Sequence, residues 1–196
     1  MSNTSIVTPC FSPGTRIATD RGTIPIEAVR AGTRLVTRDN GLRRVYWAGQ
    51  RVVPYAELCE TPQLRPILIR AGAMGEGRPF RDMLVSPTHR MLVKPDTGML
   101  KTAEPEVLVA AEFLPGLAGV EKAQTLGVSY HHVLCDRHQV ILADGAWTES
   151  FHPDDKTVLD MTPAQRKEVL SIFPEVATVG AADQFSAARQ TFDVDR

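Results

Sequence analysis

Turn-forming residues divide most of this sequence into short segments. The chain of 196 residues contains 14 glycines and 14 prolines, and both are scattered along it rather than gathered in one linker. The clearest turn lies at residues 38–41, where Asn40-Gly41 suits the positive φ angles of a type I′ hairpin turn. Frequent turns between short apolar segments are typical of all-β proteins, so we expect an all-β domain over residues 10–151.

The segments between these turns have the composition and alternation of β-strands. We expect strands over residues 16–19, 34–37, 42–53, 66–71, 82–85, 90–93, 129–134, 138–142 and 146–151. The long segment 42–53 is expected to bend at Gly49, and residues 54–65 are expected to form a loop. Residues 106–114 are expected to form a short helix, which Pro115 and Gly116 end.

The pattern changes after residue 151. Thr162-Pro163 is an N-cap residue followed by proline at the first helical position, which predicts a helix over residues 164–173. A weaker helix is expected over residues 181–192. We therefore divide the chain into a short leader (1–9), the β domain (10–151) and a partly helical C-terminal extension (152–196).

Composition argues against several classes of partner. The net charge is −1 and the sequence has no basic block, so nucleic acid is not an expected partner. No apolar run approaches the ~20 residues of a membrane helix, and residues 1–9 lack the features of a secretory signal. We expect a product that is cytoplasmic as synthesised; the final compartment is left open, with export by a signal-independent route as one alternative. Three cysteines, Cys10, Cys59 and Cys135, suit a reducing compartment or a free reactive thiol better than a disulfide scaffold.

Three polar positions have the chemistry of a reactive site. Cys10 precedes the first strand, where its thiol can reach the carbonyl of the Pro9–Cys10 peptide bond. Ser86 and His89 bracket a tight corner stiffened by Pro87, so a hydroxyl and an imidazole can be aimed at one point. Each motif alone is more often structural: a small apolar anchor for Cys10, and a polar turn for the Ser86–His89 corner.

Two other readings of the histidines and cysteines stay open at this point. His132, Cys135 and His138 have i, i+3, i+6 spacing, but a step of three in a strand turns the middle side chain to the opposite face. We therefore expect no metal and no cofactor. A dyad of Cys10 with a neutral histidine would make a thiol hydrolase, although no local protease signature supports it.

The order of these motifs resembles that of the Hint superfamily, the self-cleaving domains of inteins and hedgehog proteins. The likeness is greatest to bacterial Hint-like domains that begin Cys-Phe-x-x-Gly-Thr-x-Ile. It covers residues 8–152, and the motifs are specific in combination although none is specific alone. The matching stretches are CFSPGTRI (10–17), IEAVRAGTRLVTRDNG (26–41), LVSPTHR (84–90), YHHVLCDRH (130–138) and ADGAWTES (143–150).

The resemblance implies a fold and a set of roles. The fold would be an all-β horseshoe of long bent hairpins that brings the first and last strands together. Cys10 would be the nucleophile, Ser86 would replace the usual threonine of a Thr-x-x-His motif, and His89 would protonate the departing amine. His138 falls on the histidine of the motif near the end of the domain, in the stretch YHHVLCDRH (130–138). The substrate would be the chain's own leader, with an external nucleophile as a further partner.

One departure from inteins restricts the chemistry that the resemblance implies. The positions of the terminal His-Asn pair hold Glu149 and Ser150, and the next residue is Phe151. Serine has no side-chain amide to cyclise and phenylalanine has no nucleophile, so splicing by the usual route is not expected. What remains is an N-to-S acyl shift at Pro9–Cys10 and release by water or another nucleophile. The alternatives are a catalytically silent Hint-like binding module and a thiol-dependent or metal-dependent hydrolase.

Overall fold

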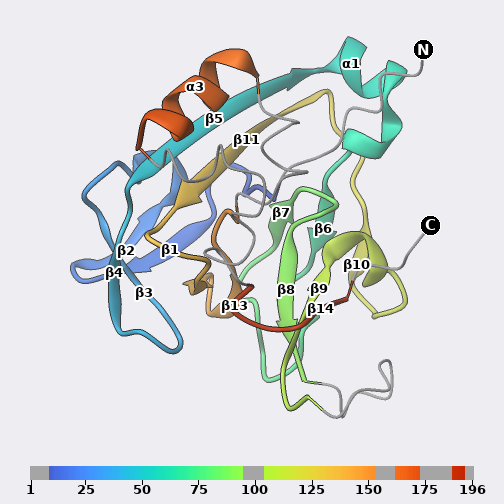
Figure 1. Ribbon diagram of the computed structural model, residues 1–196. Helices are drawn as coiled ribbons and strands as arrows, with labels where there is room; N and C mark the ends of the chain where they lie inside the picture. Colours follow the sequence, from blue (N-terminus) through green and yellow to red (C-terminus); the bar gives the residue numbers. More distant parts are fainter. Residues whose placement is uncertain (1–8, 95–103, 153–161, 173–186, 193–196) are drawn as a thin grey trace.

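The computed structural model describes residues 9–94, 104–152, 162–172 and 187–192 (Figure 1). Strands dominate these ranges, as the turn pattern predicts. The strands are β1 (Arg16–Thr19), β2 (Gly22–Pro25), β3 (Arg34–Val36), β4 (Leu42–Arg44), β5 (Trp47–Pro54), β6 (Ile67–Ile69), β7 (Met83–Val85), β8 (Arg90–Val93), β9 (Val107–Ala110), β10 (Val120–Lys122), β11 (Gly127–Leu134), β12 (Val140–Ala143), β13 (Ala146–Glu149) and β14 (Thr191–Phe192). The helical elements are α1 (Tyr55–Glu60), α3 (Pro163–Ile172) and the short 3-10 turns η1 (Ile26–Ala28), η2 (Pro62–Leu64) and η4 (Ala111–Phe113).

Three groups of hydrogen-bonded strands make up this part of the chain. The largest runs in the order β14-β9-β8-β13-β12-β1-β3-β4, with β2 paired to β1. A second has the order β10-β6-β7, and the third is the antiparallel pair of β5 and β11. The β5–β11 pair is the longest, and it crosses the top of the molecule in Figure 1. Strands from both ends of the β domain are neighbours, because β1 pairs with β12, which in turn pairs with β13.

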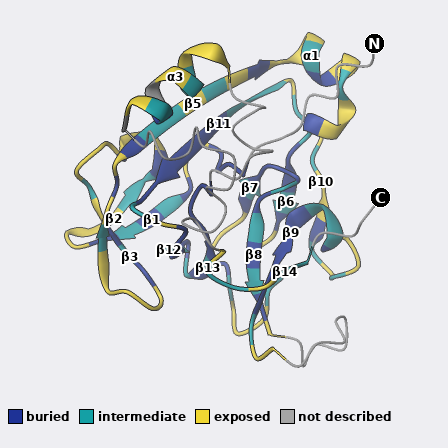
Figure 2. Ribbon diagram, in the orientation of Figure 1, coloured by how far each residue is buried: buried dark blue, intermediate teal, exposed yellow. Residues whose placement is uncertain are grey.

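The core lies between these sheets. Its largest cluster draws apolar side chains from nearly every strand, and Figure 2 shows the central strands as buried. Two smaller clusters flank it. The first joins Trp47, Leu134 and Phe151 to Val169 of α3, and the second joins Cys10 to Val53, Leu58, Leu64 and Tyr130.

The local predictions for residues 54–65 and for residues 107–110 were wrong. Residues 54–65 contain α1 and η2 rather than only a loop, because Leu58 and Leu64 are buried against the β5–β11 pair and anchor these turns. Residues 107–110 form β9 rather than a helix, since all four side chains are buried between neighbouring strands, and tertiary pairing overrides local helix preference.

The hairpin at residues 37–41 is wider than a two-residue turn. Strands β3 and β4 pair at Val36 and Leu42, which leaves five residues between them. Gly41 has a positive φ of 64°, but Asn40 does not, so the turn is not type I′. The Thr37 hydroxyl donates to the Gly41 carbonyl at 2.7 Å and accepts from the Asn40 N–H at 3.1 Å, which stabilises the longer loop.

The C-terminal extension contributes one helix and one strand to the described structure. Helix α3 begins at Pro163 as predicted, and Thr162 and Gln165 exchange hydrogen bonds in a capping box. Residues 187–190 are irregular rather than helical, and residues 191–192 form β14, which pairs in parallel with β9. The rest of the expected helix, 181–186, and the predicted helix end at 173 lie outside the described residues.

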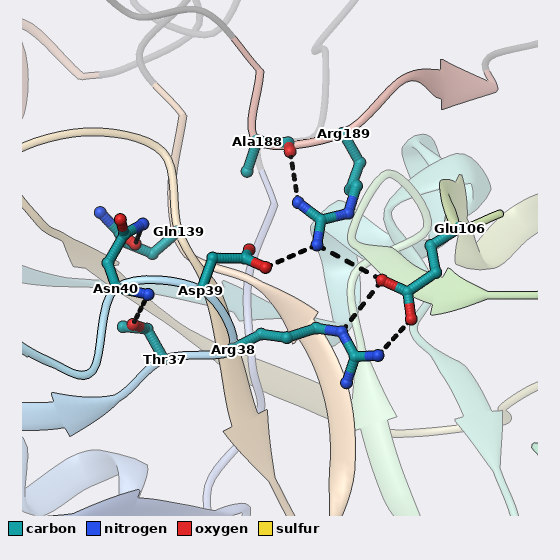
Figure 3. A network of polar contacts seen from close by, with 8 residues as sticks. All are labelled: Thr37, Arg38, Asp39, Asn40, Glu106, Gln139, Ala188 and Arg189. Atoms are coloured by element: carbon teal, nitrogen blue, oxygen red, sulfur yellow. Dashed lines mark hydrogen bonds and ion pairs between the residues drawn. The ribbon is translucent and has the colours of Figure 1, made fainter. Parts of the chain in front are cut away.

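Ion pairs join this last segment to the 37–41 hairpin and to Glu106, the residue before β9. Arg189 donates to Asp39 at 2.7 Å and to Glu106 at 3.3 Å, and Glu106 also accepts from Arg38 (Figure 3). The two guanidiniums lower the pKa of Glu106 although burial alone would raise it. Within the ranges given above, no helix is long and apolar enough to cross a membrane.

Candidate functional site

The Pro9–Ser12 segment lies between β7 and β11 and is bonded to both. Phe11 forms antiparallel bridges to Val85 on one side and to His131 on the other. The Phe11 N–H and carbonyl both bond to His131, at 2.9 and 2.8 Å. Since antiparallel partners step in opposite directions, this register sets Cys10 opposite both Ser86 and His132. Side chains alternate between faces, so these three share one face and Phe11 lies on the other.

Ser86 forms hydrogen bonds with both backbone groups of Cys10, the N–H and the carbonyl. The Cys10 N–H donates to the Ser86 hydroxyl oxygen at 2.9 Å, and the Ser86 N–H donates to the Cys10 carbonyl at 3.0 Å. Ser86 is fully buried. The first of these bonds involves the nitrogen of the Pro9–Cys10 peptide bond, so the Ser86 hydroxyl contacts the amide next to the Cys10 thiol.

His132 contacts both the Cys10 thiol and the carbonyl oxygen of Pro9. Its Nδ1 and Nε2 atoms lie 3.4 and 3.5 Å from the Cys10 Sγ, and Nδ1 lies 3.2 Å from the Pro9 carbonyl oxygen. A carbonyl oxygen only accepts hydrogen bonds, so this contact requires the proton of the neutral ring to be on Nδ1. The Nε2 lone pair is then available to the thiol.

Burial keeps the His132 ring neutral. The side chain is 4% exposed, and this burial lowers its pKa to about 4, while the bond to Pro9 acts in the opposite direction. Trp47 stacks on the ring with centroids 5.9 Å apart, and Phe151 meets it edge-on at 5.6 Å. Phe151 follows the last strand of the domain, so His132 touches both the Cys10 thiol and the end of the β domain.

His89 lies at the end of the Ser86–His89 corner, and its ring is directed away from solvent. The backbone N–H of His89 donates to the Ser86 carbonyl at 3.0 Å, which closes the predicted turn. The ring packs edge-on against Phe11, and Nε2 lies 2.5 Å from the Thr148 hydroxyl. That hydroxyl donates its proton to the Arg90 carbonyl, so His89 must donate from Nε2. Burial lowers the His89 pKa to about 4, and the buried Nδ1 atom has no hydrogen-bond partner among the described residues.

His138 belongs to a different polar cluster. Its Nε2 lies 3.1 Å from a Glu149 carboxylate oxygen, although the ring N–H is not aligned for a hydrogen bond, and its Nδ1 accepts from the Ala188 N–H at 3.1 Å. The Glu149 carboxylate accepts from the backbone N–H of Arg90 at 2.7 Å and from its guanidinium at 3.3 Å. The His152 ring stacks on His138 with centroids 4.6 Å apart.

Glu149 is fully buried, and its charge is stabilised by these neighbours. Burial alone would raise its pKa, but the contact with His138 and the charge of Arg90 outweigh that effect and lower it. Ser150 is also buried, and its hydroxyl accepts from the Gln139 N–H at 3.0 Å. The residues at the expected end of the domain are therefore held in the core.

The structure thus groups the predicted site residues unequally. Cys10 and Ser86 are in direct contact, and His89 adjoins them through the corner, whereas His138 contacts Glu149 and the C-terminal segment. The prediction missed His132 as a partner of Cys10. The neighbouring pair His131-His132 was a signal, but alternation alone does not say which ring faces the thiol.

The spacing of His132, Cys135 and His138 does not produce a metal site. Cys135 is packed in the main hydrophobic core, and burial raises the pKa of its thiol to about 12. In the part of the chain that is described, no group of three or more metal-binding side chains is close enough to hold an ion.

Comparison with known proteins gives a family and a set of similar folds. The Hint domain family matches residues 9–155. Solved structures similar to this chain include the gp41-1 intein (11% identity, TM-score 0.44, 72% of this chain and 98% of that one). A bacterial intein-like domain from Clostridium thermocellum (15%, 0.43, 72% and 97%) and a DnaB intein from Synechocystis sp. PCC 6803 (7%, 0.46, 73% and 99%) are also similar. A search of curated proteins finds no match.

The family match spans the complete Cys10 site and the strands that hold it. It extends from Pro9, through the Ser86–His89 corner, to the residues after Phe151. The all-β fold expected from the turn pattern agrees with this match. On this evidence the chain belongs to the Hint domain family.

Proposed function

We propose that this domain cleaves its own chain at the Pro9–Cys10 bond through an N-to-S acyl shift. The observation that supports this most strongly is the arrangement around one peptide bond. Its nitrogen donates to Ser86, its carbonyl oxygen contacts His132, and the thiol that would attack contacts the same imidazole. Three contacts from two side chains, Ser86 and His132, fit a reaction at this bond better than a role for Cys10 as a packing residue.

The reaction forms one bond and breaks another without a co-reactant. The Cys10 thiolate attacks the Pro9 carbonyl carbon, and a tetrahedral oxyanion forms. The C–N bond then breaks, a proton goes to the Cys10 nitrogen, and Pro9 is left as a thioester on Cys10. Water or an external nucleophile then attacks the thioester carbonyl and releases the leader, while the thiol recovers its proton.

The fold would have to favour a reaction that is uphill in solution, because an amide is more stable than a thioester. Backbone distortion in a closely packed site supplies ~1–3 kcal/mol per strained residue. The scissile unit is anchored by hydrogen bonds to two strands and is buried with its thiol only 2% exposed. Such anchoring holds the thiol beside the carbonyl and replaces solvent with fixed donors.

The residues at the end of the domain, Glu149 and Ser150, fit N-terminal cleavage without splicing. Ser150 stands where an intein would have asparagine, and its hydroxyl is bonded to the Gln139 backbone. Glu149, at the penultimate position, is paired with Arg90. We therefore restrict the proposal to the first half of the intein reaction, with the leader as the substrate.

Intact mass measurement tests the proposal. The folded chain is incubated with dithiothreitol or hydroxylamine, both of which attack thioesters, and the mass is followed with time. We expect a product that begins at Cys10, or one that ends at Pro9 and carries the added nucleophile. Cys10→Ala should abolish this product, whereas Cys59→Ala, which changes an exposed cysteine on α1, should not.

Two outcomes of this experiment would contradict self-cleavage by Cys10. A protein that is folded by circular dichroism yet keeps an unchanged mass in both reagents would not be self-cleaving. That result would favour the catalytically silent Hint-like module. Cleavage that persists in Cys10→Ala would instead point to another nucleophile.

A further inference from the structure

We propose that His132 is the acid–base residue of the shift, removing the thiol proton through Nε2 and holding the Pro9 oxyanion through Nδ1–H. This inference rests on the proposed function, and it assigns both tasks to one ring. The sequence resemblance assigned the proton transfer to His89, and no role was given to His132.

The contacts of the ring support this division of tasks, although both ring nitrogens lie close to Sγ, Nδ1 at 3.4 Å and Nε2 at 3.5 Å. Nδ1 lies 3.2 Å from the Pro9 carbonyl oxygen and must therefore carry the proton in the neutral ring. Nε2 lies 3.5 Å from Sγ and has the free lone pair that a base needs. Because the donor already points at the carbonyl oxygen, it meets the negative charge where that charge develops.

The register of the strands explains why His132 does this and His131 does not. The Phe11–His131 bridge sets Cys10 opposite His132, and alternate residues of β11 face opposite sides. The His131 ring lies near the Ser129 hydroxyl instead, at 3.4 Å. Two adjacent histidines therefore have different surroundings, and only one meets the thiol.

His89 is less suited to the proton transfer at neutral pH. Its one ring proton is donated to the Thr148 hydroxyl, and its Nδ1 has no proton to give. His132, in contrast, gains a proton when it deprotonates the thiol. We assign His89 to positioning, since its ring packs on Phe11 and its N–H closes the corner that carries Ser86.

One proton then makes a closed cycle. It moves from Sγ to His132 Nε2 as the S–C bond to Pro9 forms, and the ring becomes an imidazolium. It moves from Nε2 to the Cys10 nitrogen as the C–N bond breaks, and the ring returns to its neutral form. No outside acid or base is consumed in the shift.

Variants at two adjacent histidines test this assignment. In the full chain, thiol-induced cleavage is timed by intact mass for wild type, His132→Ala, His132→Asn and the control His131→Gln. His132→Ala removes the base and the oxyanion donor and should slow cleavage by ~10²-fold or more. His132→Asn keeps an N–H near the Pro9 oxygen but no base, so its rate should lie between those of wild type and His132→Ala. His131→Gln should stay within about twofold of wild type, since that ring has no contact with the thiol.

The outcomes separate this inference from the proposed function. If wild type cleaves and folded His132→Ala cleaves at the same rate, the assignment to His132 is wrong while the proposed function stands. If His131→Gln is as slow as His132→Ala, the ring contacts do not determine the rate and the assignment is also wrong. If folded wild type never cleaves, both proposals fail. Should His132→Ala not fold, His132→Asn gives the decision by the same comparison.

Discussion

Replacing Glu149 by glutamine should strongly destabilise the fold. Glu149 is fully buried, and its carboxylate accepts from Arg90 at 2.7 and 3.3 Å and lies 3.1 Å from His138. The amide oxygen of glutamine can keep the bond to the Arg90 N–H, but the buried guanidinium, 12% exposed, loses its counter-charge. Breaking a buried pair costs about 3–5 kcal/mol, and the retained bond places this variant near the lower value.

The expected shift in melting temperature follows from the size of the chain. For a domain of this size, 1 kcal/mol corresponds to about 2–4 °C, so a loss of about 3 kcal/mol lowers Tm by roughly 6–12 °C. Thermal unfolding followed by circular dichroism at neutral pH measures this. Glu121→Gln is the matched control, because Glu121 pairs with Arg70 at 2.7 Å with both side chains 55% exposed. Such surface pairs contribute at most about 1 kcal/mol.

The sign of the pH dependence adds a second check. The pKa of Glu149 is lower in the folded state than its ordinary value, so its stabilising effect is present above that value and is lost as the pH falls through the folded pKa. The Tm gap between wild type and Glu149→Gln should therefore shrink in acid. A gap below about 2 °C at neutral pH would refute the reasoning, because it lies below the smallest loss expected for a buried pair.

Three further results are expected. Burial lowers the pKa of His89 and His132 to about 4, so the stability from keeping each ring neutral is present above pH ~6.5 and is lost as the pH falls toward 4. Chemical denaturation across this range should show a loss of roughly 3 kcal/mol per histidine, and a flat profile would contradict it. Gly49→Ala should destabilise by about 1–3 kcal/mol, because the added methyl would lie 2.2 Å from the Trp47 ring; an unchanged urea midpoint would argue against that packing. Arg189→Ala should release the C-terminal segment, which limited proteolysis would detect as faster cleavage near β14 at an unchanged rate in the β domain.

Local patterns predicted the strand-rich character and the two chain segments that carry Cys10 and Ser86. They failed where long-range packing decides the structure. Residues 107–110 have side chains that suit a helix or a buried strand, and pairing with β8 on one side and β14 on the other decides for a strand. The turns of 54–65 are fixed by Leu58 and Leu64, whose partners Val53 and Tyr130 come from other strands.

The candidate site shows the same limit at the level of single side chains. Cys10 and Ser86 were predicted because their chemistry and order along the chain are distinctive. His132 was not, since its contact with Cys10 depends on a strand register that joins residues 122 positions apart. The surroundings of His138 depend on Ala188, in a segment whose path could not be foreseen from a helical pattern.

The most direct test of the central claim is the rate at which thiol releases the leader from the folded chain. Wild type and Cys10→Ala are incubated side by side with dithiothreitol, and intact mass is recorded over time. We predict that wild type is converted to a species beginning at Cys10, while Cys10→Ala keeps its mass. Equal behaviour of the two folded proteins, whether both are cleaved or neither is, would contradict Cys10 as the nucleophile of a self-cleaving domain.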